Sequence, residues 1–182
     1  MKATVIGLGK LGSPMAACLA ARGLEVVGVD ADSRKVEAIN QGKPPVQGPG
    51  MAEMLARSEG RLSAANDLEG AVRDSDASFI AVATPSEPPG GFSLRYVEPV
   101  CQAIGRALAA RKDYHLVTLT STVMPGTTGN QLRTILEKAS GKRCGPDFGL
   151  CYSPEFIALG SVIRDFLNPD MLLIGESDTR AG

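Results

Sequence analysis

The sequence has no tryptophan and a single histidine, and its four cysteines, Cys18, Cys101, Cys144 and Cys151, show no Cys-x-x-Cys spacing. Without a cluster of histidine and cysteine ligands, no metal site is predicted. We expect the thiols to be reduced and mostly buried, as in cytoplasmic proteins. His115 opens an apolar run, and we expect it to be a solvated residue at the sheet edge rather than a catalytic group.

The sequence also lacks an excess of charge of one sign and lacks long apolar runs. The 19 basic and 20 acidic residues give a net charge of −1, so we expect neither a nucleic-acid partner nor binding to an anionic membrane. No apolar run approaches the length that crosses a bilayer, and Lys2 leads directly into a strand-like segment. Neither a transmembrane helix nor a signal peptide is predicted, which favours a cytoplasmic location.

Apolar runs of strand length alternate with segments of helical period along all 182 residues, and 21 glycines and 12 prolines suit many tight turns. Continuously apolar runs such as SFIAVA, residues 78–83, are typical of parallel strands that are buried on both faces. We therefore predict one domain over residues 1–182 with an α/β fold. It is a doubly wound, mostly parallel sheet with helices on both faces, as in a Rossmann fold.

The individual elements are predicted from the same patterns. Helices are expected over 12–23, 33–42, 51–59, 66–75, 94–110 and 127–139, with Ser33 and Asn66 as N-caps. Strands are expected over 3–8, 24–30, 61–65, 77–84, 115–122, 149–153 and 171–175. The segment PSEPPGG, residues 85–91, is expected to be a loop.

The segment GLGKLG has the spacing of a phosphate-binding turn, because it follows an apolar strand and opens a helix. Gly7 permits the tight turn, Gly9 lets the backbone approach a pyrophosphate, and Gly12 lets the helix pack on the strand. The helix N-terminal amides, around Lys10 and Leu11, then face the phosphates. The alternative is a tight strand–helix turn without a ligand.

Asp30 ends the second apolar run, 18 residues after Gly12. At that place a carboxylate accepts hydrogen bonds from an adenosine ribose and repels a 2′-phosphate, so NAD is favoured over NADP. Arg34 lies close by and could favour NADP, but Asp30 comes first after the strand, and we expect its charge to outweigh that of Arg34.

Three motifs in the second half follow predicted strands in order: VATPS (82–86), STVMPGTT (121–128) and SPEFIALGSVIRDFLNPD (153–170). Together they resemble the UDP-glucose/GDP-mannose dehydrogenase family, the nucleotide-sugar 6-dehydrogenases. QGPGM (47–51) is similar to that family's Glu-Pro-Gly-Leu segment, with Gly48 in place of its glutamate. The opening GLGKLGSPMAACLA also resembles β-hydroxyacid dehydrogenases, but their Asp-Ala-Pro-Val-Ser-Gly-Gly-like segment is absent after STV.

The resemblance implies NAD as cofactor and a nucleotide sugar as substrate, with the C6 alcohol of a UDP- or GDP-hexose oxidised to a carboxylate in two hydride transfers. It implies that Thr122 helps hold a catalytic water within the cofactor site and that Glu155 is an assisting base. It places Thr84 and Pro85 beside the nicotinamide. Thr84, Thr122 and Glu155 lie at the C-terminal ends of predicted parallel strands, and ligands bind at that edge of an open α/β sheet. The alternatives are a turn residue at Thr122 and a helix-start acid at Glu155.

The family's cysteine nucleophile, in a Gly-Gly-x-Cys segment, and its oxyanion lysine have no counterpart here; Cys151 is expected to be a core thiol. The resemblance therefore implies an NAD-binding domain without the family's central helical and C-terminal sugar-nucleotide domains, inactive alone and homodimeric at full length. Leu159 replaces a second family carboxylate, which leaves the sugar open. The alternatives are a β-hydroxyacid-type dehydrogenase domain and a non-catalytic NAD-sensing module.

Overall fold

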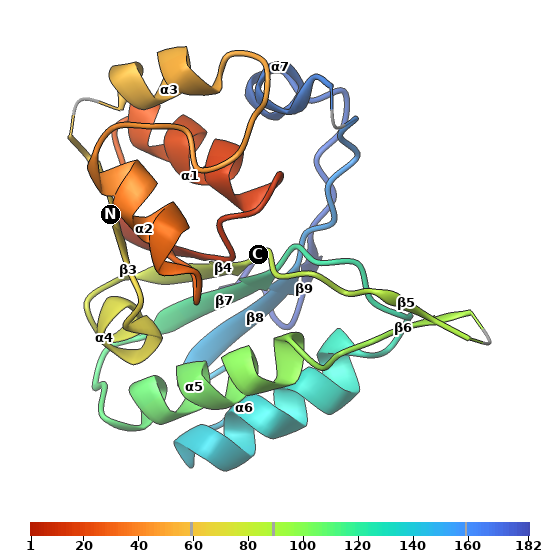
Figure 1. Ribbon diagram of the computed structural model, residues 1–182. Coiled ribbons are helices and arrows are strands. Elements are labelled where there is room, and N and C mark those ends of the chain that lie inside the picture. Colours follow the sequence, from red (N-terminus) through yellow and green to blue (C-terminus); the bar gives the residue numbers. More distant parts are fainter. Residues whose placement is uncertain (59, 89, 159) are drawn as a thin grey trace.

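One sheet organises the computed structural model, which describes residues 1–58, 60–88, 90–158 and 160–182 (Figure 1). In spatial order the strands are β3 (Leu62–Ala65), β2 (Glu25–Val29), β1 (Lys2–Ile6), β4 (Ala77–Ile80), β7 (His115–Leu119), β8 (Phe148–Tyr152) and β9 (Gly175–Glu176). The first six of these pair in parallel, and β9 runs antiparallel to β8. This strand order agrees with the predicted doubly wound α/β fold.

The first strand lies in the middle of the sheet, and the direction in which successive strands are added across the sheet reverses once. From β1 it moves outward to β2 and β3, and then it returns to place β4 on the other side of β1. The carboxyl ends of β1 and β4 therefore meet at a topological switch point, which is where open α/β sheets bind ligands. The glycine-rich turn follows β1 directly, so the topology delivers it to this point.

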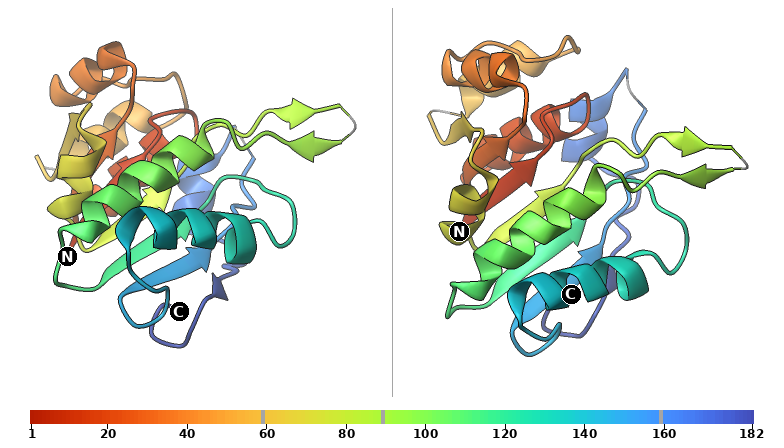
Figure 2. Two further views of the ribbon diagram at one scale, coloured as in Figure 1. Left: turned by 90° about the horizontal axis from the view of Figure 1, so that it is seen from below. Right: turned by 60° about the horizontal axis from the view of Figure 1, so that its bottom comes forward.

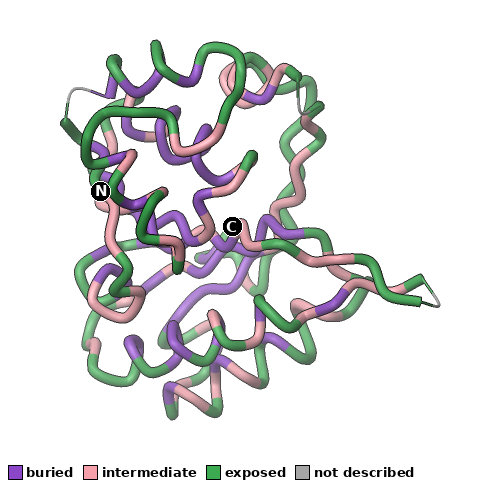
Figure 3. The backbone as a smooth tube through the Cα atoms, viewed as in Figure 1, coloured by how far each residue is buried: buried purple, intermediate pink, exposed green. Residues whose placement is uncertain are grey.

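Helices cover both faces of the sheet (Figures 1 and 2). Each helical layer packs on the sheet with its own apolar core, and the strands between them are buried (Figure 3). One layer contains α1 (Gly12–Ala21), α2 (Ser33–Asn40), α3 (Met51–Arg57) and α7 (Val162–Leu167); the other contains α4 (Leu68–Arg73), α5 (Val97–Ala109) and α6 (Arg133–Ser140), which continues the π-helical turn η1 (Thr128–Leu132).

Both predicted N-caps are wrong by one residue. Asp32 caps α2, because its carboxylate accepts a hydrogen bond from the Arg34 N–H at 3.0 Å. Asp67 caps α4 in the same way, through the Gly70 N–H at 2.9 Å. In each case a carboxylate stands beside the expected Ser33 or Asn66, and aspartate is as good a cap as either.

Two further segments, 85–91 and 171–175, differ from the predicted secondary structure. The predicted loop 85–91 contains a small antiparallel hairpin of β5 (Ser86–Glu87) and β6 (Gly91–Phe92), which projects from the body of the molecule (Figure 2). The predicted last strand, 171–175, is reduced to Gly175–Glu176. Residues 171–174 are instead exposed, each with 46–66% of its surface accessible, so their apolar character is not explained by packing within the described residues.

The prediction of a solvated His115 is wrong. The residue opens β7 inside the sheet and has no exposed surface. Its Nδ1 contacts the Ser75 carbonyl oxygen at 3.0 Å, and its Nε2 contacts the Ser78 hydroxyl at 2.8 Å. These two buried partners satisfy both ring nitrogens, which is what allows the ring to be buried at all.

Candidate cofactor site

The glycine-rich turn is packed tightly between the carboxyl ends of β1, β2 and β4. The Gly7 N–H donates to the Val29 carbonyl oxygen at 2.7 Å, and Gly7 has a φ of 100°, which favours glycine. A Cβ at Gly7 would lie 2.7 Å from the Ala81 carbonyl oxygen, and one at Gly12 would collide with the Gly7 carbonyl oxygen. Chain packing therefore requires glycine at the first and third positions.

Gly9 is a glycine for a different reason. A Cβ there would meet nothing within 4 Å, so packing within the chain does not exclude a side chain, whereas close approach of a ligand would. Helix α1 begins at Gly12 with the half-buried Leu11 as its N-cap and no capping side chain, and Lys10 is exposed. The Ser13 N–H already donates to the Gly9 carbonyl oxygen at 3.1 Å and Pro14 has no N–H, so what this helix start offers a pyrophosphate is the positive end of the helix dipole and the backbone of the turn before it.

Asp30 holds its carboxylate firmly at the end of β2. One oxygen accepts hydrogen bonds from the Leu8 N–H at 2.8 Å and from Lys35 Nζ at 3.0 Å, and the other accepts from the Asp32 N–H at 2.9 Å. The carboxylate keeps 12% of its side-chain surface accessible, and one of its roughly four lone pairs is left, on the oxygen that accepts from the Asp32 N–H. It can therefore accept one further hydrogen bond from a sugar hydroxyl.

The cation that reaches Asp30 is Lys35, which the sequence analysis did not single out. Arg34, the residue considered there, instead makes a bidentate contact with Asp32 at 3.0 and 2.9 Å and is largely exposed. Helical geometry could have identified Lys35 from the sequence, because a lysine on the first turn of the helix that follows a strand-end acid can fold back onto that acid. Arg34 is therefore paired with Asp32, and it is Lys35 that contacts the Asp30 carboxylate.

A cavity of about 510 Å³ opens beside the glycine turn and Asp30. This volume is within the range of cofactor and ligand sites. The cavity runs along the switch point and across to the first turns of α4 and α5. The cavity wall next to the glycine turn is polar backbone, and the opposite wall is mostly apolar side chains. The lining includes Gly7, Gly9, Asp30, Ala31, Lys35, Asn66, Leu68, Val82, Ala83, Tyr96 and Val100.

The structure brings together the loops that follow β4 and β7. The Ser121 hydroxyl donates to the Val82 carbonyl oxygen at 2.6 Å, and this bond fixes the STV segment against the VATPS segment. Thr84 and Pro85 are half-buried, and Thr122 is exposed at the same edge of the sheet. None of these three is among the described residues that line the 510 Å³ cavity. Ser121, which joins the loops, was missed from the sequence because serine has many roles in turns.

Glu155 lies in a second cavity, of about 390 Å³, which shares no described lining residue with the first. The cavity is mostly apolar and is closed by Met15 of α1, Phe166 of α7 and the side chains of Leu172 and Ile174. The Ser153 N–H donates to the Leu119 carbonyl oxygen at 2.9 Å, so the chain leaves β8 alongside β7. Burial in this apolar setting raises the pKa of the Glu155 carboxyl.

The four cysteines are all unpaired and buried. Burial raises the pKa of the Cys18 thiol to about 11 and that of Cys101 to about 12. Burial also raises the pKa of Cys151, which lines the same cavity as Glu155. A thiol nucleophile needs a lowered pKa, so these environments disfavour that chemistry for all three.

Leu159, where the resemblance leads us to expect a carboxylate, lies outside the described residues. Within the described ranges, no group of three or more histidine, cysteine or acidic residues could hold a metal ion. The same ranges contain no helix of the length and apolar character needed to cross a membrane.

A family model described as "UDP-glucose/GDP-mannose dehydrogenase family, NAD binding domain" matches residues 1–182. GDP-mannose 6-dehydrogenase of Pseudomonas aeruginosa is 45% identical, and the match covers 100% of this chain and 42% of the relative. UDP-glucose 6-dehydrogenase AglM of Haloferax volcanii is 39% identical, again over 100% of this chain and 42% of the relative. The chain thus spans about two fifths of the length of these relatives.

Solved structures agree with the sequence comparison. A ternary complex of the Pseudomonas aeruginosa GDP-mannose dehydrogenase superposes with a TM-score of 0.96 at 45% identity, over 100% of this chain and 42% of that chain. The likeness therefore extends over every element that forms the two cavities.

Proposed function

Given that the chain belongs to the UDP-glucose/GDP-mannose dehydrogenase family, of which it forms the NAD binding domain, we propose that it holds NAD⁺ for the oxidation of a nucleotide-linked hexose at C6. The observation that carries this proposal is the joint geometry of Gly9 and Asp30. An open glycine and a strand-end carboxylate line one cavity at the switch point of the sheet.

Each proposed cofactor contact follows from that geometry. Gly7 and Gly12 shape the turn, and the backbone of Gly9, Lys10 and Leu11 binds the pyrophosphate. The Asp30 carboxylate accepts a hydrogen bond from a ribose hydroxyl, and its negative charge disfavours a 2′-phosphate.

We place the chemical end of the site at the strand ends beyond the cavity. Bound NAD⁺ would accept hydride from the sugar. Thr84, Pro85 and Thr122 flank the nicotinamide, and the Thr122 hydroxyl orients a water. Glu155, whose carboxyl pKa is raised by burial, takes a proton from that water as a base. The raised pKa is the support for its role, because a carboxylate with a higher pKa is a stronger base near neutral pH.

The remaining parts of the reaction are proposed to lie outside these 182 residues. They include the cysteine nucleophile, the lysine and the binding surface for the nucleotide sugar, as well as the contacts of a homodimer. The support is that the relatives named above are more than twice as long as the matched region. The unpaired cysteines support a cytoplasmic location.

Calorimetric titration tests the cofactor proposal. We expect NAD⁺ to bind more tightly than NADP⁺. Asp30→Asn should weaken NAD⁺ binding about 10-fold, because it replaces a charged acceptor of a ribose hydroxyl by a neutral one. The matched control is Asp32→Asn, since this neighbouring carboxylate caps α2 and does not line the cavity. Absence of binding, or tighter binding of NADP⁺, would contradict the proposal.

A turnover assay tests the assignment of the remaining chemistry. With NAD⁺ and either GDP-mannose or UDP-glucose, the 182-residue chain alone should form no NADH above background. Sustained NADH formation by this polypeptide would show that a complete active site lies within it.

A further inference from the structure

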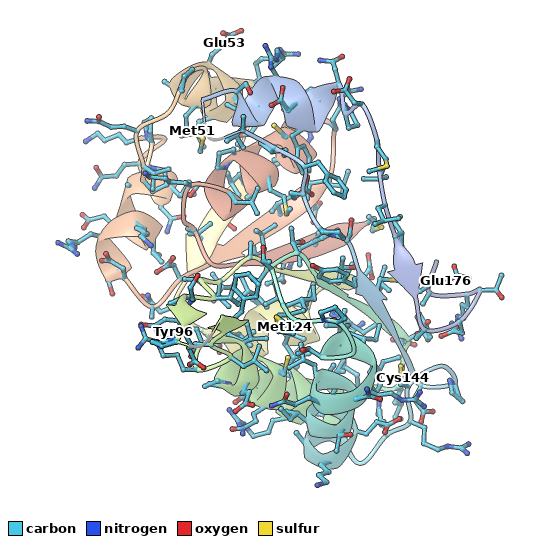
Figure 4. The ribbon with its side chains drawn as sticks, turned by 90° about the vertical axis from the view of Figure 1, so that its right-hand side faces the viewer. Met51, Glu53, Tyr96, Met124, Cys144 and Glu176 are labelled. Carbon is cyan, nitrogen blue, oxygen red and sulfur yellow. The ribbon has the colours of Figure 1, made fainter. Side chains whose placement is uncertain are left out.

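The far end of the 510 Å³ cavity is apolar and is completed by an aromatic side chain. Leu68 of α4, Val82 after β4 and Val100 of α5 form its walls, together with Tyr96. Tyr96 is the N-cap of α5 and precedes Val100 by four residues, so the two side chains lie on one face of the helix. Figure 4 labels Tyr96 where the chain enters α5.

Tyr96 is unusual among the large side chains that line the cavity because 47% of its surface is accessible. A phenol ring that borders a cavity and stays half exposed gains from being covered by a planar apolar ligand. Tyr96 lines the cavity and keeps about half of its surface accessible, so a ligand in the cavity can contact the ring.

Arg95 occupies another side of the ring. Its guanidinium carbon lies 4.7 Å from the Tyr96 ring centroid, in a cation–π contact. Arg95 is not among the described residues that line the cavity, so it contacts the ring from outside. The ring therefore borders the cavity, and the residue that holds it by a cation–π contact does not line the cavity.

We propose that Tyr96 is an affinity-determining residue of the cofactor site, whose ring stacks on the adenine base while Arg95 positions it from outside. The inference rests on the proposed function. If Asp30 binds the adenosine ribose and the glycine turn binds the pyrophosphate, the base attached to that ribose extends into the remaining, apolar end of the cavity. Leu68, Val100 and Tyr96 form that end.

The absence of tryptophan makes this stacking directly observable. The chain has three tyrosines, Tyr96, Tyr114 and Tyr152, so its intrinsic fluorescence comes from them. Adenine that stacks on Tyr96 should quench part of this emission. We would titrate the chain with ADP-ribose, which keeps the adenine and lacks only the nicotinamide base of NAD⁺, and excite at the long-wavelength edge of the tyrosine band. We expect saturable quenching in the wild type and none in Tyr96→Leu.

Binding constants separate the ring from the hydroxyl group. Tyr96→Leu keeps an apolar side chain but removes the ring, and we expect it to raise the Kd of both NAD⁺ and ADP-ribose about 10-fold. Tyr96→Phe keeps the ring and should stay within about 2-fold of wild type. Arg95→Met removes the positioning cation and should weaken both ligands about 3-fold, whereas Arg95→Lys should restore most of the loss.

The chain provides a matched control in a second arginine–tyrosine pair. The Arg180 guanidinium carbon lies 3.6 Å from the Tyr114 ring centroid, and neither residue lines the cofactor cavity among the described residues. Tyr114→Phe should therefore change neither the quenching nor the Kd of NAD⁺.

Three results would overturn the inference. One is a Kd of Tyr96→Leu within 2-fold of wild type, and another is the same ADP-ribose quenching in both proteins. The third is an equal loss of affinity in Tyr96→Phe. Each of these leaves the proposed function intact if the wild type binds NAD⁺, whereas a wild type that binds no NAD⁺ removes both. Melting temperatures of all variants identify any that fail to fold.

Discussion

Glu155 carries its carboxylate into a cavity made mostly of apolar side chains. Burial disfavours the charged form, so the pKa of this carboxyl is raised in the folded chain above its ordinary value of 4.5. A raised carboxyl pKa means that the folded state holds its proton to higher pH than the unfolded state does. Folding stability is therefore lost as the pH rises from the unfolded pKa through the folded one, and the loss is complete at higher pH.

Glu155→Gln removes that charge and should raise the melting temperature at pH 7, by about 2 °C. The difference should shrink below pH 4.5, where the wild-type carboxyl is protonated in both states. Thermal unfolding followed by circular dichroism at several pH values checks this. Glu53, an exposed acid on α3 (Figure 4), is the control, because Glu53→Gln should give no rise. A lower melting temperature for Glu155→Gln at pH 7 would show a hydrogen-bonded structural carboxylate instead.

The sequence predicted the backbone geometry of the candidate site better than its side-chain contacts. The spacing of Gly7, Gly9 and Gly12 and the place of Asp30 predict a tight turn beside a strand-end carboxylate, and the structure has both, because they depend on backbone geometry that is local in sequence. Their roles toward phosphate and ribose stay predictions. Lys35 could not be chosen over Arg34 in the same way. Which of two neighbouring cations folds onto Asp30 depends on side-chain competition with Asp32, and that is not visible in the spacing.

At the scale of elements, α5 and α6 pack so closely that one glycine decides their separation. A Cβ at Gly105 of α5 would lie 2.5 Å from the Ala139 Cβ of α6 and 3.1 Å from the Leu136 carbonyl oxygen. Real Cβ atoms do not approach that closely, so one helix would have to move. Glycine is otherwise unfavourable inside a helix, which makes its presence here a packing requirement.

Gly105→Ala should therefore destabilise the chain by about 1–3 kcal/mol, even though helix propensity alone would stabilise it by about 1 kcal/mol. Urea unfolding measures the change. The matched control is Gly129→Ala in η1, where a Cβ would meet nothing within 4 Å. There the higher helix propensity of alanine should raise the free energy of unfolding. Ala139→Gly in the Gly105→Ala background should recover part of the loss. Stabilisation by Gly105→Ala would show that the helices separate at little cost.

The predicted elements failed where a tertiary partner decides the structure. Residues 171–174 are apolar and β-prone, so sequence pattern predicts a strand, yet only Gly175–Glu176 pair with β8. The reduced strand leaves Leu172, Leu173 and Ile174 exposed. Strand formation requires an available neighbouring edge, and no local pattern reports that. The hairpin within 85–91 was missed for a related reason, since two-residue strands are too short to show alternation.

At the scale of the whole molecule, the sequence pattern was sufficient to predict the sheet type and both helical layers. Alternating strands and helices with continuously apolar strands admit few other arrangements, and right-handed crossovers fix the rest. What the pattern could not predict is which polar residues are buried in the sheet. His115 stands at a strand start, where exposure is usual, and only the neighbouring Ser75 and Ser78 make its burial possible.

His115 should make the stability of the whole fold sensitive to mild acid. Its Nδ1 donates to the Ser75 carbonyl oxygen, which can only accept, so Nε2 is the unprotonated nitrogen and accepts from the Ser78 hydroxyl. A second proton would bring a positive charge into the sheet, and burial is the main reason that the pKa of His115 is lowered to about 4 from 6.5. The hydrogen bond to Ser75 acts in the opposite direction, whereas the nearby Arg111 adds to the lowering and outweighs Asp76.

The lowered pKa fixes the direction of the effect. Above pH 6.5 the histidine is neutral in both states and contributes no pH dependence. Between pH 6.5 and pH 4 the unfolded chain binds a proton that the folded chain does not, so stability falls as the pH falls, by about 3 kcal/mol in all. Denaturant unfolding across this range measures the fall. Because the chain has one histidine, its single imidazole signal in proton NMR reports the pKa without assignment.

His115→Gln, which can keep one donor and one acceptor, should flatten the pH profile of stability between pH 4 and pH 6.5 even if it lowers stability at pH 7. An NMR pKa near 6.5 together with an unchanged profile in the variant would mean that the ring is solvated and that the start of β7 opens in solution.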